Sequence, residues 1–278
     1  MAASLVPCFK DAAVAKDVPT VSWLICTHVA NDQLRLAVQS CLQQSFSDFE
    51  LVLVINGAET ERVTQLAKAW FAADPRVRIF TTEVRHLIFS LSLGLHHARG
   101  ALVARMDSDD LSHSDRLAKQ VTFMAAHPDV VVLGTAYEII DAEGKPQKTV
   151  ILPALDADVR RAMLWGNPIC HPSVMFRREA VLAVGGYLGG LHAEDYDLWL
   201  RLAVNHANKF ANLESVCLGY RSVGVGTARR ARAAYASMAS AQFRHFANGF
   251  GLPWFLAAVV STFKGIVRSD KTSRGGQI

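Results

Sequence analysis

Short apolar segments alternate with amphipathic segments through the first half of this chain. Five apolar runs are each closed by a polar or turn-forming residue, and the segments between them carry apolar residues at helical spacing. Strands joined by helical connections pair in parallel, with helices on both faces of the sheet. The predicted strands are 20–26, 49–55, 77–81, 101–106 and 130–135, and the predicted helices are 32–44, 59–73, 90–98 and 113–126.

Beyond residue 136 the pattern is mixed. A hairpin is predicted over 137–150, short helices at 156–164, 178–184 and 194–203, and a basic helical segment from Arg229. Because 51% of its residues are hydrophobic, the chain can build one large core. We therefore expect an α/β fold with a mainly parallel, Rossmann-like sheet flanked by helices over 20–228, an N-terminal extension over 1–19 and a helical C-terminal tail over 229–278.

The net charge of +4 is unevenly distributed. From Arg229 to the end, eight Lys or Arg residues and one acid, Asp270, give +7, which leaves −3 for the rest of the chain. A basic tail favours a negatively charged partner, either membrane lipid or nucleic acid. The sequence has no helix-turn-helix, zinc-finger or aromatic RNA-binding pattern. We therefore favour lipid and expect no nucleic-acid partner.

The longest uncharged stretch of the chain, 246–263, lies in this tail. Only 252–260 is densely apolar, which is marginal for a spanning helix of about 20 residues. One interpretation is a peripheral membrane contact through 244–274, in which Trp254 and Phe255 enter the lipid. The headgroups would then meet Arg244, Lys264 and Arg268. The alternative is a C-terminal helix that packs on the domain or on a second subunit.

The cysteines and the N-terminus bear on localisation. The five cysteines are widely spaced and form no CxxC pair, which argues against a disulfide framework or a zinc site and fits a reducing compartment. The N-terminal residues include Lys10 and Asp11 and no apolar run, so no signal peptide is predicted. We expect a cytoplasmic protein, at the inner face of the plasma membrane if the tail binds lipid.

Three carboxylates follow the fourth predicted strand directly, in the order Asp107-Ser108-Asp109-Asp110. In open α/β sheets, ligands bind beyond the carboxyl ends of the strands. Crowded carboxylates repel one another, and their oxygens suit Mg²⁺ or Mn²⁺ held together with the phosphates of a substrate. The alternative interpretation is a solvated turn in which Asp110 or Ser112 caps the next helix, with Ser114 as another candidate cap.

Two further segments carry candidate functional groups. Glu194 and Asp195 open an apolar-faced helix, where the helix dipole keeps a carboxylate ionised, as a general base requires. They could equally be ordinary N-terminal helix charges. His171 lies between Cys170 and Pro172 in a Pro-rich loop and could bind a metal or a phosphate, although a lone histidine is more often structural.

The motifs in their order resemble the family 2 glycosyltransferases of the GT-A fold. The resemblance covers roughly residues 21–220. The segments that carry it are VSWLICTH at 21–28, SCLQQSFSDFELVLVING at 40–57, ARGALVARMDSDD at 98–110, NPICHPSVMFRREAVLAVGGY at 167–187 and AEDYDLWLRLA at 193–203. It implies that the protein transfers a sugar from a nucleotide-sugar donor to a glycan or lipid-linked acceptor, usually with inversion. It also implies a role in cell-surface polysaccharide synthesis.

The resemblance also implies roles for individual residues. Asp107 and Asp109 would engage Mn²⁺ or Mg²⁺ and, through it, the donor diphosphate. Asp195 would be the general base, with Glu194 as the alternative or as its support. The donor nucleotide, with a UDP-sugar favoured, would contact Thr27, His28, Asn56, Arg105 and Asp107. Residues 20–110 would then form the nucleotide-sugar half of the domain and 111–228 the acceptor half.

Some positions depart from the family pattern. Ile55 and Asn56 stand where two acids usually end the second strand, one of which reads the nucleobase. His28 replaces an aromatic residue, and no histidine occurs in 222–226. His171 is therefore a hypothetical third metal or phosphate contact. The departures also motivate a rival hypothesis, a non-catalytic nucleotide-sugar-binding or scaffold relative, against which the retained acids argue. A nucleotidyltransferase would need a Gly-rich loop, and 26–32 contains no glycine.

Overall fold

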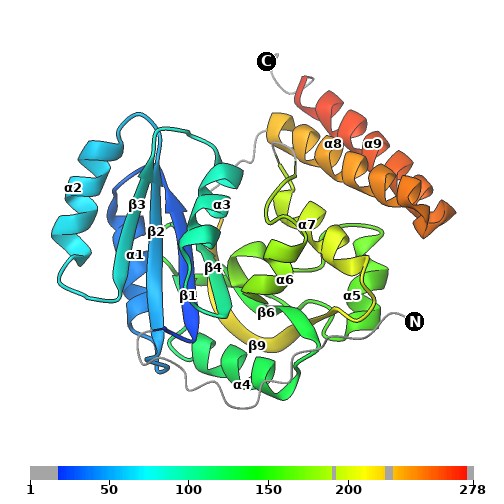
Figure 1. The fold of residues 1–278 in the computed structure, drawn as a ribbon. Helices are drawn as coiled ribbons and strands as arrows, with labels where there is room; N and C mark the ends of the chain where they lie inside the picture. The colour runs from blue at the N-terminus through cyan, green and yellow to red at the C-terminus, as the bar shows by residue number, and fades with distance from the viewer. Residues whose placement is uncertain (1–17, 190–191, 223–227, 274–278) are drawn as a thin grey trace.

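The computed structural model describes residues 18–189, 192–222 and 228–273 (Figure 1). Most of the predicted N-terminal extension and the last five residues of the tail lie outside them. The order of strands in the sheet is β3-β2-β1-β4-β8-β6-β9-β5, and β7 pairs with β6 at its side. The four strands on one side are parallel, as predicted: β1 (Val21–Thr27), β2 (Phe49–Asn56), β3 (Val77–Thr82) and β4 (Leu102–Asp107).

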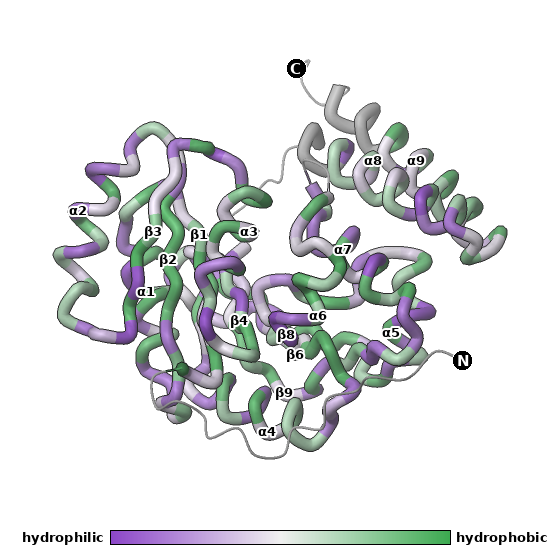
Figure 2. The backbone as a smooth tube through the Cα atoms, viewed as in Figure 1, coloured by the Kyte–Doolittle hydropathy of each residue, from purple (hydrophilic) through white to green (hydrophobic). Residues whose placement is uncertain are grey.

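Three helices connect these strands: α1 (Asp32–Leu42), α2 (Thr60–Phe71) and α3 (Leu87–His97). The side chains of β1 show how the layers form, because alternate residues point to opposite faces of a strand. Val21, Trp23 and Ile25 pack into a core with α1, α2 and α4, whereas Leu24 packs into a second core with α3 and the helices of the second half. Figure 2 shows β2 in green over much of its length.

The second half of the sheet departs from the simple parallel series. β8 (Met175–Arg177) lies between β4 and β6 (Val130–Ile140) and is antiparallel to both. β6 is longer than predicted and forms the expected hairpin with β7 (Pro146–Val150). A strand that the sequence did not indicate, β9 (Lys209–Arg221), runs parallel to β6. Register shifts interrupt this pairing near Thr135, so β9 has no clean alternation of polar and apolar residues.

The helix after the acidic segment begins later than predicted. α4 spans Arg116–Ala126, and no side chain caps its N-terminus, so the prediction of a cap at Ser112 or Ser114 was wrong. Ser112 belongs to a two-residue strand, β5 (Leu111–Ser112), that pairs with β9. The main chain of His113 bonds to Cys217, so tertiary pairing extends the segment that sequence alone assigned to the helix.

The short helices of the second half lie close to their predicted positions. They are α5 (Asp156–Met163), the 3₁₀ turn His171–Ser173, α6 (Arg178–Ala183) and α7 (Glu194–Ala203). Gly185 and Gly186, both with positive φ, end the α6 segment. α7 was expected to be amphipathic, but nine of its ten residues are buried because α8 (Ala228–His245) also packs on it.

The tail forms a helical hairpin of α8 (Ala228–His245) and α9 (Leu252–Ser273) (Figure 1). Between them, Gly249 and Gly251 adopt positive φ, near +92° and +94°, where the chain reverses. α8 packs on the domain: Gln242 Nε2 donates to the Tyr196 hydroxyl at 3.0 Å, and Arg244 pairs with Asp197. None of the helices in the described ranges has both the length and the apolar character needed to cross a membrane.

One residue of the predicted membrane segment, Trp254, points toward the protein. Trp254 is partly buried and meets the ring of His245 edge-on, with the centroids 4.4 Å apart. The expectation that Trp254 enters lipid was therefore wrong, because the hairpin turn directs it toward α8. Phe255 is 37% exposed. The side chain of Arg268 lies outside the described residues.

Candidate active site

The ends of the parallel strands bring several predicted residues to one edge of the sheet. Cys26 of β1 pairs in register with Asp107 of β4, and Thr27 pairs with Ile55 of β2. Thr27 is buried, and its hydroxyl donates to the Val29 carbonyl at 2.8 Å, while Asn56 Nδ2 donates to Ser90 Oγ at 2.7 Å. Thr27, Asn56 and Asp107 therefore lie at the ends of neighbouring strands, where Thr27 bonds its own loop and Asn56 bonds a residue of α3.

Asp107 forms an ion pair with the buried guanidinium of Arg105, which lies on the same strand. Arg105 Nη1 lies 3.1 Å from Asp107 Oδ2, and Nη2 lies 2.5 Å from Oδ1, which makes a bidentate pair. Burial lowers the pKa of Arg105, but the charges of Asp107, Tyr187 and Glu194 outweigh burial and raise it. Arg105 is therefore a permanent cation between the aspartates and the Glu194 side of the site.

The other two acids of this segment lie in different environments. Asp110 is buried, and its Oδ1 accepts the main-chain N–H of Arg221 at 2.8 Å, while its Oδ2 has no partner in the described structure. Burial, followed by the charge of Asp107, raises the pKa of Asp110 to about 8. Burial and Asp107 also raise the pKa of Asp109, whose main-chain carbonyl accepts from Arg221 Nε at 2.8 Å.

This arrangement fits a hard divalent cation. Burial is the first cause of the raised pKa values of Asp109 and Asp110 and the charge of Asp107 is the second, and a bound cation would favour the ionised form of both acids. Carboxylate oxygens are the ligands that Mg²⁺ and Mn²⁺ take. Asp110 is an anchor to β9 and not a helix cap, so the alternative of an ordinary capping turn does not describe the segment.

Asp195 sits at the start of α7 in a defined hydrogen-bond network. Asn167 Nδ2 donates to Asp195 Oδ2 at 2.5 Å, and the main-chain N–H of Tyr196 donates to Oδ1 at 2.8 Å. Ala193, the residue directly before α7, has a φ of +58°, and the chain turns sharply there into the helix. Burial, with Glu194 as the second cause, raises the pKa of Asp195 to about 6. Such a carboxylate is ionised at neutral pH and basic enough to accept a proton.

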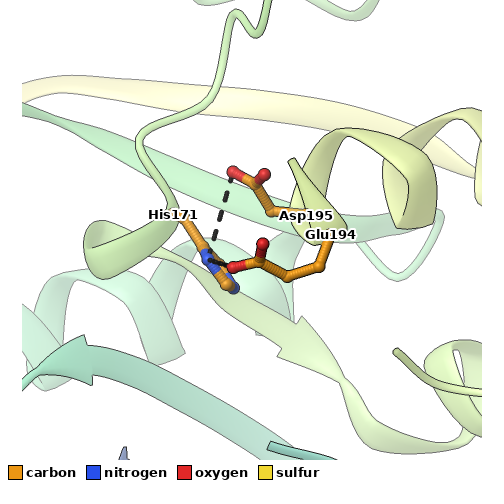
Figure 3. Close-up of side chains that lie close together, drawn as sticks. All are labelled: His171, Glu194 and Asp195. Carbon is orange, nitrogen blue, oxygen red and sulfur yellow. Dashed lines mark ion pairs between the residues drawn. The ribbon is translucent and has the colours of Figure 1, made fainter. Parts of the chain in front are cut away.

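His171 lies beside Glu194 and Asp195 (Figure 3). Its Nδ1 is 3.7 Å from Glu194 Oε1 and 4.0 Å from Asp195 Oδ2, and its Nε2 shares a hydrogen bond of 2.9 Å with the Tyr187 hydroxyl. Burial and Arg105 hold the pKa of His171 well below its usual range, so the ring is neutral. Ligand atoms of His171, Glu194 and Asp195 all lie within 4.8 Å of one another.

One cavity of about 390 Å³ is lined by Asp107 together with Glu194 and Asp195. The other predicted residues in its lining are Arg105 and His171, and the lining residues without a predicted role include Tyr137, Asn167 and Tyr220. Asp109, Thr27, His28 and Asn56 are not in its lining. Asn167 was visible only as part of a Pro-containing loop, and nothing in the sequence marks its partner in α7.

A buried arginine that sequence reasoning did not single out ties the two halves of the site together. Arg116 of α4 donates to the carbonyls of Arg105 at 2.8 Å, Pro172 at 2.9 Å and Val174 at 3.2 Å, and it is fully buried. Its guanidinium thus links the strand that carries Asp107 to the loop that carries His171.

Comparison with known proteins agrees with this architecture. Residues 22–185 match the family model described as Glycosyl transferase family 2. The chain is 31% identical over 249 residues to the O-antigen biosynthesis glycosyltransferase WbnJ of Escherichia coli, covering 89% of this chain and 97% of that one. It is 27% identical to an E. coli UDP-Gal:alpha-D-GlcNAc-diphosphoundecaprenol beta-1,3-galactosyltransferase, covering 95% and 97%.

A solved structure has the same fold. The mannosyltransferase PcManGT from Pyrobaculum calidifontis, in complex with GDP-Man and Mn²⁺, superposes with a TM-score of 0.66 at 18% identity, covering 97% of this chain and 80% of that one. The predicted α/β, GT-A-like fold is thereby confirmed.

Proposed function

This chain belongs to glycosyltransferase family 2, and from that premise we propose that it transfers a sugar from a nucleotide-diphosphate sugar to a glycan or lipid-linked acceptor, with inversion. The observation that supports the proposal is the shared cavity, which both Asp107 and Asp195 line. A direct displacement needs groups for the leaving diphosphate and for the attacking hydroxyl, and these two carboxylates supply one for each.

On the donor side, Asp107 and Asp109 would hold Mn²⁺ or Mg²⁺. When bound, that ion would neutralise the charge that develops on the departing diphosphate. Arg105 fixes the orientation of Asp107 through its bidentate contact and adds a positive charge beside the aspartates. Thr27, His28 and Asn56 lie at or near the ends of β1 and β2 and are proposed to contact the nucleotide, in the half formed by 20–110.

On the acceptor side, Asp195 would take the proton of the attacking hydroxyl. Its pKa of about 6 leaves it ionised at neutral pH, and Asn167 orients the oxygen that would accept the proton. Neutral His171 cannot compensate the charge of the two acids, so Glu194 raises the basicity of Asp195. We propose that His171 positions these acids, and that a role in metal or phosphate binding is the alternative.

The relatives support a proposal for the substrate classes. One relative is named for UDP-Gal and a diphosphoundecaprenol-linked acceptor, whereas the structural neighbour holds GDP-Man. We propose a UDP-sugar donor, a lipid-linked acceptor and a role in surface-polysaccharide synthesis at the cytoplasmic face of the membrane. Ile55 cannot hydrogen-bond a nucleobase, so base selection would fall to Asn56 and main-chain groups.

A transfer and hydrolysis screen over UDP-, GDP- and dTDP-sugars with Mn²⁺ tests the proposal. We expect one donor class to be consumed in a Mn²⁺- or Mg²⁺-dependent manner, and the Asp109→Ala and Asp195→Ala variants to lose transfer. Donor binding without turnover in the presence of acceptor extracts would instead favour the scaffold hypothesis.

A further inference from the structure

The outer face of the α8–α9 hairpin gathers exposed apolar side chains. Isolated exposed apolar residues are ordinary on a protein surface, but a contiguous patch marks an interaction site. Nine of the twenty large apolar side chains that are exposed in the described structure lie between residues 243 and 267. They are Phe243, Leu252, Phe255, Leu256, Val259, Val260, Phe263, Ile266 and Val267.

Packing within the hairpin leaves most of this face uncovered. α9 turns small residues toward α8, and Ala257, Ala258 and Ser261 are 1%, 6% and 3% exposed. Leu256, Val259 and Phe263 recur at helical spacing on the opposite side and are 52%, 51% and 65% exposed. The helix therefore carries one covered stripe of small residues and one exposed apolar stripe.

Aromatic rings and a groove extend the patch onto α8. The rings of Phe243, Phe246 and Phe255 cluster with centroids 5.3 to 6.4 Å apart. Beside them, a groove of about 810 Å³ runs between the two helices and is lined mainly by Ala, Val and Phe side chains, with Arg232 among its lining residues. The face thus offers both a projecting apolar ridge and a recess.

The charge around this face selects its partner. No Asp or Glu occurs between Arg229 and Ser269, whereas Arg232 and Lys264 are exposed beside the patch. We propose that the outer face of the hairpin docks on the surface of a lipid bilayer that carries anionic headgroups. Apolar side chains would enter the acyl boundary while the cations meet the headgroups. A two-fold contact with a second copy would instead bring together two acid-free, basic faces.

The hairpin also links this surface to the site. α8 is fixed to α7 by the Gln242–Tyr196 hydrogen bond and the Arg244–Asp197 ion pair, and α7 begins with Glu194 and Asp195. Docking would therefore fix the distance and orientation of the acceptor side of the cavity relative to the bilayer. The proposal does not depend on transfer activity, because vesicle binding is measured without a substrate.

Vesicle co-sedimentation of the full chain tests the proposal. We expect binding to phosphatidylglycerol-containing vesicles that weakens in high salt and is weaker on pure phosphatidylcholine. The double variant Val259→Ser/Phe263→Ser removes two outward side chains and should reduce the partition coefficient by about tenfold or more. Lys264→Ala should reduce binding several-fold, by roughly the contribution of one cation near the surface.

Matched controls separate docking from general changes. Ile151→Ser removes an apolar side chain that is 67% exposed outside the hairpin, and Lys148→Ala removes an exposed cation on β7, so both should bind like the parent. Thermal unfolding checks that the variants keep their fold. Absence of binding to anionic vesicles, unchanged binding of the double variant, or a dimer that the double variant abolishes without any vesicle binding would each overturn the proposal.

Discussion

The side-chain amide of Asn167 and the carboxylate of Asp195 face each other at 2.5 Å, across 28 residues of sequence. This contact joins the loop before β8 to the first turn of α7. It stabilises the ionised form of the proposed base, because a hydrogen bond to a carboxylate lowers its pKa. Without it, the raised pKa of Asp195 would be higher still.

The first prediction concerns this bond. Asn167→Ala should shift the acidic limb of the pH profile of kcat/KM upward. A hydrogen bond to a charged group contributes roughly 1.5 kcal/mol, about one pKa unit, so kcat/KM at pH 6 should fall roughly fivefold and recover at higher pH. Asn248→Ala, at an exposed position in the hairpin turn, is the control. A uniform loss at every pH would show that Asn167 has only a structural role.

The second prediction identifies the base. Transfer by the parent should fall as the pH drops through about 6, because protonation of Asp195 removes the acceptor for the hydroxyl proton. Asp195→Asn should lose transfer by about 10²–10⁴-fold while it retains donor binding. Glu194→Gln should keep most of the activity, with its acidic limb shifted downward because one neighbouring charge is removed. The reverse ranking of the two variants would assign the base to Glu194.

The third prediction concerns the metal. Asp109→Asn should raise the Mn²⁺ concentration required for half-maximal activity by at least about tenfold, since even partners outside the ligand shell cost about 10–100-fold in metal affinity. Direct Mn²⁺ binding, followed by electron paramagnetic resonance, gives a readout besides turnover. Asp158→Asn on α5, an exposed acid that pairs with Arg161, is the control. Metal binding that Asp109→Asn leaves unchanged would exclude Asp109 as a ligand.

The fourth prediction concerns Arg116. Arg116→Met would leave the carbonyls of Arg105, Pro172 and Val174 buried without their donor. We expect the free energy of unfolding in urea to fall by about 3 kcal/mol or more. Arg161→Met, at a side chain that is 75% exposed, should change it by less than about 0.5 kcal/mol. Equal effects of the two variants would show that the three-carbonyl contact does not hold the site together.

The sequence by itself determined the local elements and the chemical identity of the candidate groups. Continuous apolar runs predicted the four parallel strands, because strands covered on both faces are apolar throughout. Apolar residues at helical spacing predicted the helices, because a helix packed on a sheet buries one face. The position of Asp107 at the end of β4 follows from the same rule. The segment around Glu194 and Asp195 was predicted as a helix start, and α7 begins at Glu194.

Tertiary structure decided which of these groups meet. The insertion of β8 beside β4, and the pairing of β9 with β6, depend on contacts between segments far apart in the chain, for which local periodicity carries no information. For the same reason, sequence could not show that Asn167 bonds Asp195, that His171 lies with Glu194, or that Arg221 anchors Asp110. Burial then set the pKa values of these carboxyls, because desolvation depends on the whole surrounding fold and not on the residue type.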